Sequence, residues 1–151
     1  MADVRRLVSA LRPPALDELG LVGALRQVAS ASDTQGLDGL QVRVEASDRL
    51  PPLPAAVEVA AYRITQEALT NVVRHARARV CVIRLQVAGR SLRLSIEDDG
   101  AGLSASHRPG VGLASMRERA EELGGTFAID RPAGGGTCVQ VVLPLPPEID
   151  T

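Results

Sequence analysis

Apolar residues recur at helical spacing in four stretches of the chain. They fall at every third or fourth position in residues 3–11, 15–31, 55–77 and 113–123. Proline separates the first two stretches, and the third contains no glycine or proline. Because proline interrupts a helix and glycine weakens one, we expect a short leading helix and then three full helices, of which residues 55–77 form the longest.

Five other stretches alternate apolar and polar residues, as strands with one buried face do. The predicted order is α, β, α, β, β, α, β, β, which mixes hairpins with helices instead of alternating strictly. This order predicts an α+β fold, a two-layer α/β sandwich with three helices on one face of a mixed five-stranded sheet. The predicted strands are Gln41–Ala46, Val80–Val87, Ser91–Glu97, Thr126–Asp130 and Thr137–Leu143.

Composition excludes several classes of function. The 151 residues, 45% of them hydrophobic, can bury one ordinary core. A net charge of -1 gives no basic field for a nucleic acid, and Tyr62 and Phe127 are the only aromatic residues on which bases could stack. All 17 basic residues are arginines. The absence of lysine excludes P-loop and protein-kinase folds, which both bind phosphate through a lysine.

Cysteine and histidine give no sign of a metal site. Cys81 and Cys138 lie in separate alternating apolar runs, which favours buried free thiols over metal ligands or a redox pair. His75 and His107 are the only histidines, and no metal-ligand spacing surrounds them. No signal peptide begins the chain, and no apolar run approaches the ~20 residues of a membrane span. We therefore expect a cytoplasmic domain, and a membrane anchor in a longer parent protein stays open.

The longest predicted helix carries a cluster of polar residues. Glu67, Asn71 and His75 are spaced i, i+4 and i+8, and Arg74 follows Asn71 after three residues, so all four lie on neighbouring parts of one helix surface. Asn71 projects at the edge of the apolar face, where a polar side chain needs a partner. That partner is either a ligand or a neighbouring backbone group, and this stretch alone does not decide between them.

Two glycine-containing segments follow the helix. Asp98-Asp-Gly-Ala-Gly102 ends an apolar strand, so Asp98 can be partly buried while Gly100 and Gly102 admit a planar group close to the backbone. A turn selected for glycine and aspartate is the alternative. Gly110-Val-Gly112 precedes a helix, and with the helix N-terminus it forms a candidate anion site.

Two other enzyme classes are disfavoured by context. Residues 100–105 match a Gly-x-Gly-x-x-Ala dinucleotide fingerprint, but Pro109 and Gly110 come before any helix. No second strand ends in the acid that such a site needs for the ribose. No serine occupies a Gly-x-Ser-x-Gly elbow, so Ser-His-Asp hydrolysis is unsupported.

Taken together, these segments resemble the GHKL family of ATPases and kinases, which has the Bergerat-type ATP-binding fold. The family signature is an acidic residue or Asn four positions before an Asn on one helix, then Asp-x-Gly-x-Gly, then Gly-x-Gly before another helix, then Gly-Thr entering the last strand. Order and spacing agree over residues 40–145. Finer detail resembles the sensor histidine kinases that partner LuxR-type response regulators. The segments that match are Glu67–Asn71, Asp98–Gly102, Gly110–Gly112 and Gly136-Thr137 for the family, and Leu11–Leu21, Arg63–Ala76 and Gly112–Arg119 for the branch.

The resemblance implies that these residues surround Mg-ATP. Asp98 would accept a hydrogen bond from the exocyclic amine of adenine, directly or beside a water shared with Thr137, and Gly100 and Gly102 would let the ring approach the backbone. Asn71 would hold Mg²⁺ through its carbonyl oxygen, a hard ligand for a hard ion.

The remaining residues would serve the phosphates and the reaction. Glu67 occupies the catalytic position, where its role is a base, a water anchor or a support for Mg²⁺. The residues implied near the phosphates are Arg74 and His75, and those implied in a lid over the nucleotide are His107, Arg108, Gly110, Val111, Gly112 and Leu113.

An intact kinase of this kind also carries a phosphoacceptor histidine on a dimerisation helix, and neither His75 nor His107 fits that part. The resemblance implies that residues 1–12 are a remnant of the dimerisation helix, 13–147 the catalytic ATP-binding domain and 148–151 a tail. Such a fragment should be monomeric and should not phosphorylate itself, whereas its parent would be a homodimer. Two alternatives stay open, an ATP-dependent regulatory binding module and an anti-sigma-factor serine kinase of the same superfamily.

Overall fold

The computed structural model describes residues 12–34, 39–47, 50–76, 78–100, 111–132 and 134–147. Of the proposed dimerisation remnant, residues 1–12, only Arg12 is described, and the tail from residue 148 lies outside the described residues. The elements in chain order are α2 (Pro14–Thr34), β1 (Gln41–Ala46), α3 (Ala55–Asn71), the π-helical turn η1 (Val72–Ala76), β2 (Val80–Ala88), β3 (Ser91–Asp98), α4 (Val111–Glu122), β4 (Thr126–Asp130) and β5 (Thr137–Pro144).

The five strands form one mixed sheet in the order β1-β2-β3-β5-β4. β1 pairs with β2 in parallel, and every other pairing is antiparallel. Gly89 and Arg90 alone connect β2 to β3, and the positive φ of Gly89, 61°, suits a tight hairpin turn. β3 is therefore the central strand, held on both sides, and Asp98 is its last residue.

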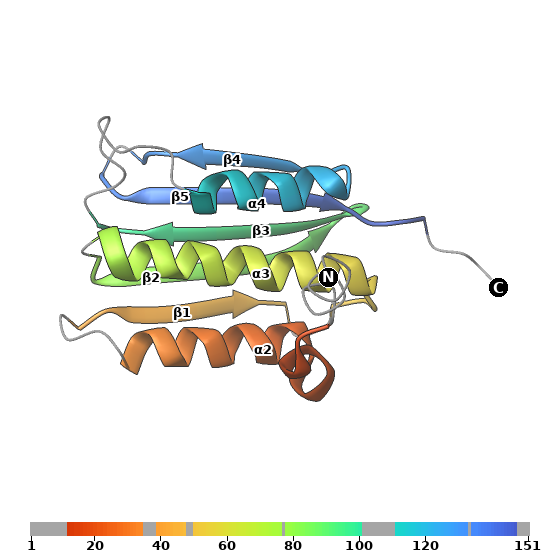
Figure 1. Cartoon of the computed structure of the whole chain (residues 1–151), viewed down its shortest axis with the longest axis horizontal. Coiled ribbons are helices and arrows are strands. Elements are labelled where there is room, and N and C mark those ends of the chain that lie inside the picture. The colour runs from red at the N-terminus through yellow and green to blue at the C-terminus, as the bar shows by residue number, and fades with distance from the viewer. Residues whose placement is uncertain are drawn as a thin grey trace, which may run out of the picture.

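All three helices cover the same face of the sheet (Figure 1), which confirms the predicted two-layer α/β sandwich. α2 lies beside β1, α3 crosses the middle of the sheet, and α4 covers β5 and β4. The strand residues that face the helices are apolar and buried, as Ile83 and Leu94 are, and they pack against Ile64 and Leu69 of α3 and Met116 of α4. In the described part of the chain, no helix combines the length and the hydrophobicity that a membrane span needs.

Arg12 ties the segment before α2 to the helical layer. Its guanidinium forms ion pairs with Asp17 in the first turn of α2 and, at 2.8 Å, with Glu58 in the first turn of α3. Arg12, which belongs to the segment that carries part of the branch resemblance, therefore joins the two helices at their N-terminal ends.

The strand predictions are confirmed to within one residue, whereas the helix predictions need three corrections. The helix predicted over 15–31 is interrupted at Gly20, whose φ of 73° and ψ of 175° are not helical. The helix predicted to reach residue 77 is α-helical only to Asn71, and Val72–Ala76 adopt the wider i→i+5 pattern of a π-helix. α4 begins at Val111, so Gly112 lies in its first turn and not before it.

Candidate functional site

The polar residues singled out in the sequence gather at one end of the sheet. Figure 1 shows that the end of β3, the start of β5, the C-terminal end of α3 and the N-terminal end of α4 all lie there. Antiparallel pairing places Asp98 of β3 directly opposite Thr137 of β5. Since α3 packs on β3, the segment that begins at Glu67 lies over the same end. The fold thus brings together residues from three separate sequence segments.

Asp98 is a buried carboxylate. It continues the helix-facing side of β3 after Ile96, and the residue is only 6% exposed. Its Oδ1 accepts a hydrogen bond from the Gly100 amide at 2.8 Å. Burial raises the pKa of Asp98, the Gly100 hydrogen bond opposes that rise, and the neighbouring carboxylates of Asp99 and Glu97 add to it. The charged form of Asp98 is therefore held at a cost in free energy, which a hydrogen-bond donor would offset.

Thr137 and Gly136 form the wall beside Asp98. Thr137 is 8% exposed and is, with Asp98 and Thr65, one of the buried polar residues in the described part of the chain. A Cβ added to Gly136 would lie 1.9 Å from the Asp98 carbonyl oxygen, so no larger residue fits without movement of the backbone. The φ of Gly136 is 92°, a conformation that favours glycine. Gly136 therefore allows β5 to begin in direct contact with the end of β3.

The Asp99 side chain has other hydrogen-bond partners than that of Asp98. One of its carboxylate oxygens accepts hydrogen bonds from two backbone amides, those of Arg79 at 2.8 Å and Val80 at 3.0 Å. The amide of Asp99 in turn donates to the Val80 carbonyl at 3.2 Å. The Val80 hydrogen bond is the main cause that lowers the pKa of Asp99, and the Arg79 amide adds to it. This contact could not be predicted from the sequence, because nothing in the local pattern relates residue 99 to residues 79 and 80.

The junction of α3 and η1 presents the remaining polar residues. Glu67 and Asn71 are half-buried, and Arg74 is exposed. Within the described part of the chain, no hydrogen bond or ion pair occupies the side chains of Glu67 and Asn71. Because the backbone widens after Asn71, Arg74 and His75 do not continue the α-helical face on which the i, i+4, i+8 spacing would place them. The side chain of His75 lies outside what the structure describes.

The segment predicted as a lid lies mostly outside the described residues. Gly102, His107, Arg108 and Gly110 lie outside the described residues, as does the side chain of Val111. What is described is the start of α4 at Val111, at the same end of the sheet as Asp98 (Figure 1). The first amides of a helix have no partner within the helix, so this end is suited to an anion. Leu113 is half-buried and packs against the core.

Cys81 is a further neighbour of the site that sequence reasoning treated only as a buried thiol. It pairs with Asp98 across β2 and β3, and it is fully buried. Cys81 and Cys138 are both free and buried, as predicted. Burial raises the pKa of the Cys81 thiol to about 12, with smaller contributions from Asp98 and Asp99. Cys81 is therefore a neutral, apolar surface beside the carboxylate.

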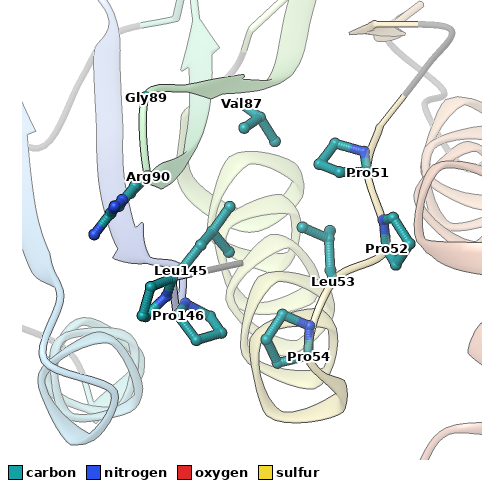
Figure 2. Close-up of a pocket in the computed structure, with 10 residues that line it drawn as sticks. Pro51, Pro52, Leu53, Pro54, Val87, Gly89, Arg90, Leu145 and Pro146 are labelled. Carbon is teal, nitrogen blue, oxygen red and sulfur yellow. The ribbon is translucent and has the colours of Figure 1, made fainter. Parts of the chain in front are cut away.

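A large cavity lies at the opposite end of the molecule. It has a volume of about 710 Å³, and Figure 2 shows that it is lined by prolines before α3, by the β2–β3 hairpin and by the segment after β5. The cavity borders the first residues of α3 and β3, whereas Asn71 and Asp98 are the last residues of these two elements. The cavity therefore contains none of the residues that the sequence analysis assigned to a ligand.

Comparison with known proteins agrees with this arrangement. Residues 56–147, more than half of the chain, match the family model described as histidine kinase-, DNA gyrase B- and HSP90-like ATPase. The chain is 38% identical over 145 residues to the signal transduction histidine-protein kinase/phosphatase UhpB of Salmonella typhimurium, covering 93% of this chain and 28% of that protein. It is 32% identical over 146 residues to the oxygen sensor histidine kinase NreB of Staphylococcus carnosus, covering 95% of this chain and 42% of that protein. The chain thus spans less than half the length of these relatives.

The fold is also similar to a solved structure of the same kind. The histidine kinase domain of the blue-light activated histidine kinase from Erythrobacter litoralis EL346 superposes with a TM-score of 0.65 at 28% identity, over 80% of this chain and 59% of that chain. The matched family model shows that the chain belongs to the histidine kinase-, DNA gyrase B- and HSP90-like ATPases, and the sequence relatives and the solved structure that it resembles are histidine kinases.

Proposed function

We propose that the end of the sheet marked by Asp98 binds Mg-ATP and that the domain supplies the γ-phosphate to a histidine on the dimerisation helix of its parent protein. One observation carries the proposal. Asp98 places a buried carboxylate at the end of the central strand, opposite Thr137, and no ion pair in the described part of the chain neutralises it. A buried charge of this kind needs a ligand that donates a hydrogen bond. The exocyclic amine of adenine is such a donor.

The surroundings of Asp98 suit a flat ring. Among the described residues only the Gly100 amide donates to the carboxylate, so acceptor capacity is left for the adenine amine. The Thr137 hydroxyl lies on the neighbouring strand and would join this contact, directly or beside a water. Gly100 has no side chain to block the ring, and Gly102 would extend the same open surface.

The junction of α3 and η1 suits the metal and the phosphates. Asn71 is half-buried, and its side-chain oxygen accepts no hydrogen bond from any described protein group, which fits a hard Mg²⁺ ligand. The bound ion would neutralise phosphate charge during transfer. Arg74, together with His75, would meet the phosphates, and the amides from Gly110 to Leu113 at the start of α4 would complete the anion site.

The partners follow from the printed names of the relatives and from the resemblance. UhpB and NreB are histidine kinases. We propose that the parent of this chain is a homodimer that phosphorylates its own histidine and passes the phosphate to a LuxR-type response regulator. The domain would act in the cytoplasm, where ATP is available.

The roles of Asn71 and Glu67 can be separated by experiment. The chain is mixed with the phosphoacceptor helix of its parent, and Mg-ATP affinity and single-turnover transfer are measured separately, with the chain alone as the control without acceptor. Asn71→Ala removes an oxygen from the metal shell, so binding and transfer should fall together. Glu67→Gln keeps the shape but removes the charge, so affinity should stay within a few-fold while transfer falls by roughly 10²-fold or more if Glu67 is the base.

Two results would contradict these assignments. If Glu67→Gln loses binding as severely as Asn71→Ala and transfers normally from bound ATP, Glu67 supports the metal and is not a base. If the chain alone acquires an acid-labile, base-stable phosphate on His75 or His107, the acceptor lies within this chain and the proposed division of labour is wrong.

A further inference from the structure

The carboxylate of Asp99 extends the contact between the end of β3 and the start of β2 beyond the last paired residues of the two strands. The ladder between β2 and β3 ends with the pair Cys81 and Asp98. Beyond that pair, the Asp99 side chain accepts from the amides of Arg79 and Val80, and its own amide donates to Val80. The Arg79 carbonyl also accepts from the amide of Gln41 at 2.8 Å. The start of β1, the start of β2 and the end of β3 are thus linked through one short stretch of backbone.

This stretch lies between the two halves of the candidate nucleotide site. On one side, η1 ends at Ala76, so Arg79 follows closely after the segment that carries Asn71 and Arg74. On the other side, Asp98 directly precedes Asp99, and Gly100 directly follows it. Ala78 is buried and anchors the stretch in the core. Any shift of Asp99 relative to Arg79 would therefore change the distance between the adenine end and the metal end of the site.

We propose that Asp99 is a positioning residue that sets this distance, so that one nucleotide can reach Asp98 with its base and Asn71 with its metal-bound phosphates. The inference rests on the proposed function of the site. Asp99 itself contacts backbone amides only, and its side chain is exposed, so it acts through the segments that it joins. Preorganised spacing of this kind matters because both contacts must be made by the same ligand.

The hydrogen bonds of the Asp99 side chain can be separated by substitution from the effect of its negative charge. Asp99 is also a negative charge beside Asp98, and that charge raises the pKa of Asp98. An amide oxygen can accept the same two hydrogen bonds without the charge. Asp99→Asn should therefore keep the positioning role, whereas Asp99→Ala removes both the hydrogen bonds and the charge.

The test compares Asp99→Ala, Asp99→Asn and the control Asp130→Ala in the chain as it stands. Asp130 is also an exposed aspartate at the end of a strand whose carboxylate accepts a backbone hydrogen bond, from Arg131 at 2.9 Å. Two ligands are titrated, adenosine, which can reach only the Asp98 end, and Mg-ATP, which must reach both ends. Amide hydrogen exchange at Arg79 and Val80 is measured without ligand.

The proposal predicts that Asp99→Ala lowers Mg-ATP affinity roughly tenfold but leaves adenosine affinity within about twofold. Exchange at Arg79 and Val80 should accelerate in Asp99→Ala only, and Asp99→Asn and Asp130→Ala should behave as the wild type. An equal loss for both ligands, or no rescue by Asp99→Asn, overturns the positioning role. If wild type binds neither ligand, the proposed function fails, and unchanged exchange in Asp99→Ala would refute the Asp99 link independently.

Discussion

At the scale of the residue, the candidate site contains two neighbouring aspartates whose surroundings in the fold have opposite effects on their pKa values. Burial raises the pKa of Asp98, whereas backbone amides lower the pKa of Asp99. Asp98 faces the helices at the end of the central strand, and Asp99 turns to the backbone at the start of β2. The first carboxylate is therefore available to a ligand, and the second is used by the protein itself.

The buried charge of Asp98 should cost stability when no nucleotide is bound. Because its pKa in the folded chain lies above the unfolded value, its contribution is most favourable at low pH and is lost as the pH rises through the folded pKa. Asp98→Asn keeps an oxygen acceptor for the Gly100 amide but carries no charge. We expect the nucleotide-free variant to unfold at higher urea concentration than wild type at neutral pH and to lose this advantage in acid. A variant that is less stable than wild type at neutral pH would contradict this explanation.

Substitution of Gly136 should destabilise the fold, because this residue contacts the Asp98 backbone closely. Gly136→Ala would force a Cβ to within 1.9 Å of the Asp98 carbonyl oxygen, at a φ that alanine rarely adopts. We expect a loss of about 2 kcal/mol or more in the free energy of unfolding, measured with urea, together with weaker nucleotide binding. Gly134→Ala is the matched control, because a Cβ there meets nothing within 4 Å and should change stability by only about 0.5 kcal/mol. Equal stability of the two variants would show that the contact is not tight.

At the scale of the element, the change from α-helix to π-helix occurs directly after Asn71. A π-helical turn holds one residue more than an α-helical turn spanning the same length, so it rotates the residues that follow. Deleting Val73, which is 42% exposed, should convert η1 to α-helix and change the direction in which the Arg74 side chain points. We expect Mg-ATP affinity to fall roughly tenfold or more, while circular dichroism shows a folded chain.

Val73→Ala is the control for the deletion, since it removes the same exposed side chain but keeps the number of residues. It should bind Mg-ATP as the wild type does. A deletion variant with unchanged affinity would show that the π-helical turn has no part in placing the residues that we propose to bind the phosphates.

The elements that alternate or repeat strictly were predictable from sequence, and the departures from regularity were not. β1 and β4 begin and end at the predicted residues, because side chains of a half-buried strand must alternate. The break at Gly20 and the π-helical turn at Val72 were missed, because apolar spacing does not distinguish one extra residue in a turn from a continuous α-helix. The link between Asp99 and Arg79 was missed for another reason. It depends on which strand ends meet in space, which the local pattern does not contain.

At the scale of the whole molecule, the sandwich places its candidate nucleotide site and its large cavity at opposite ends. The central strand runs from the hairpin at Arg90, beside the cavity, to Asp98 at the site. The described parts of the motifs lie at the ends of elements that the fold brings to one edge of the sheet (Figure 1).

The central claim is that Asp98 recognises adenine, and calorimetric titration with Mg-ATP and Mg-GTP tests it most directly. Guanine presents a carbonyl where adenine presents an amine, so two acceptors would face each other at Asp98. We predict that wild type binds ATP at least roughly tenfold more tightly than GTP, and that Asp98→Asn loses most of its ATP affinity. Equal affinity for the two nucleotides, or an Asp98→Asn variant that binds ATP as the wild type does, would contradict the account.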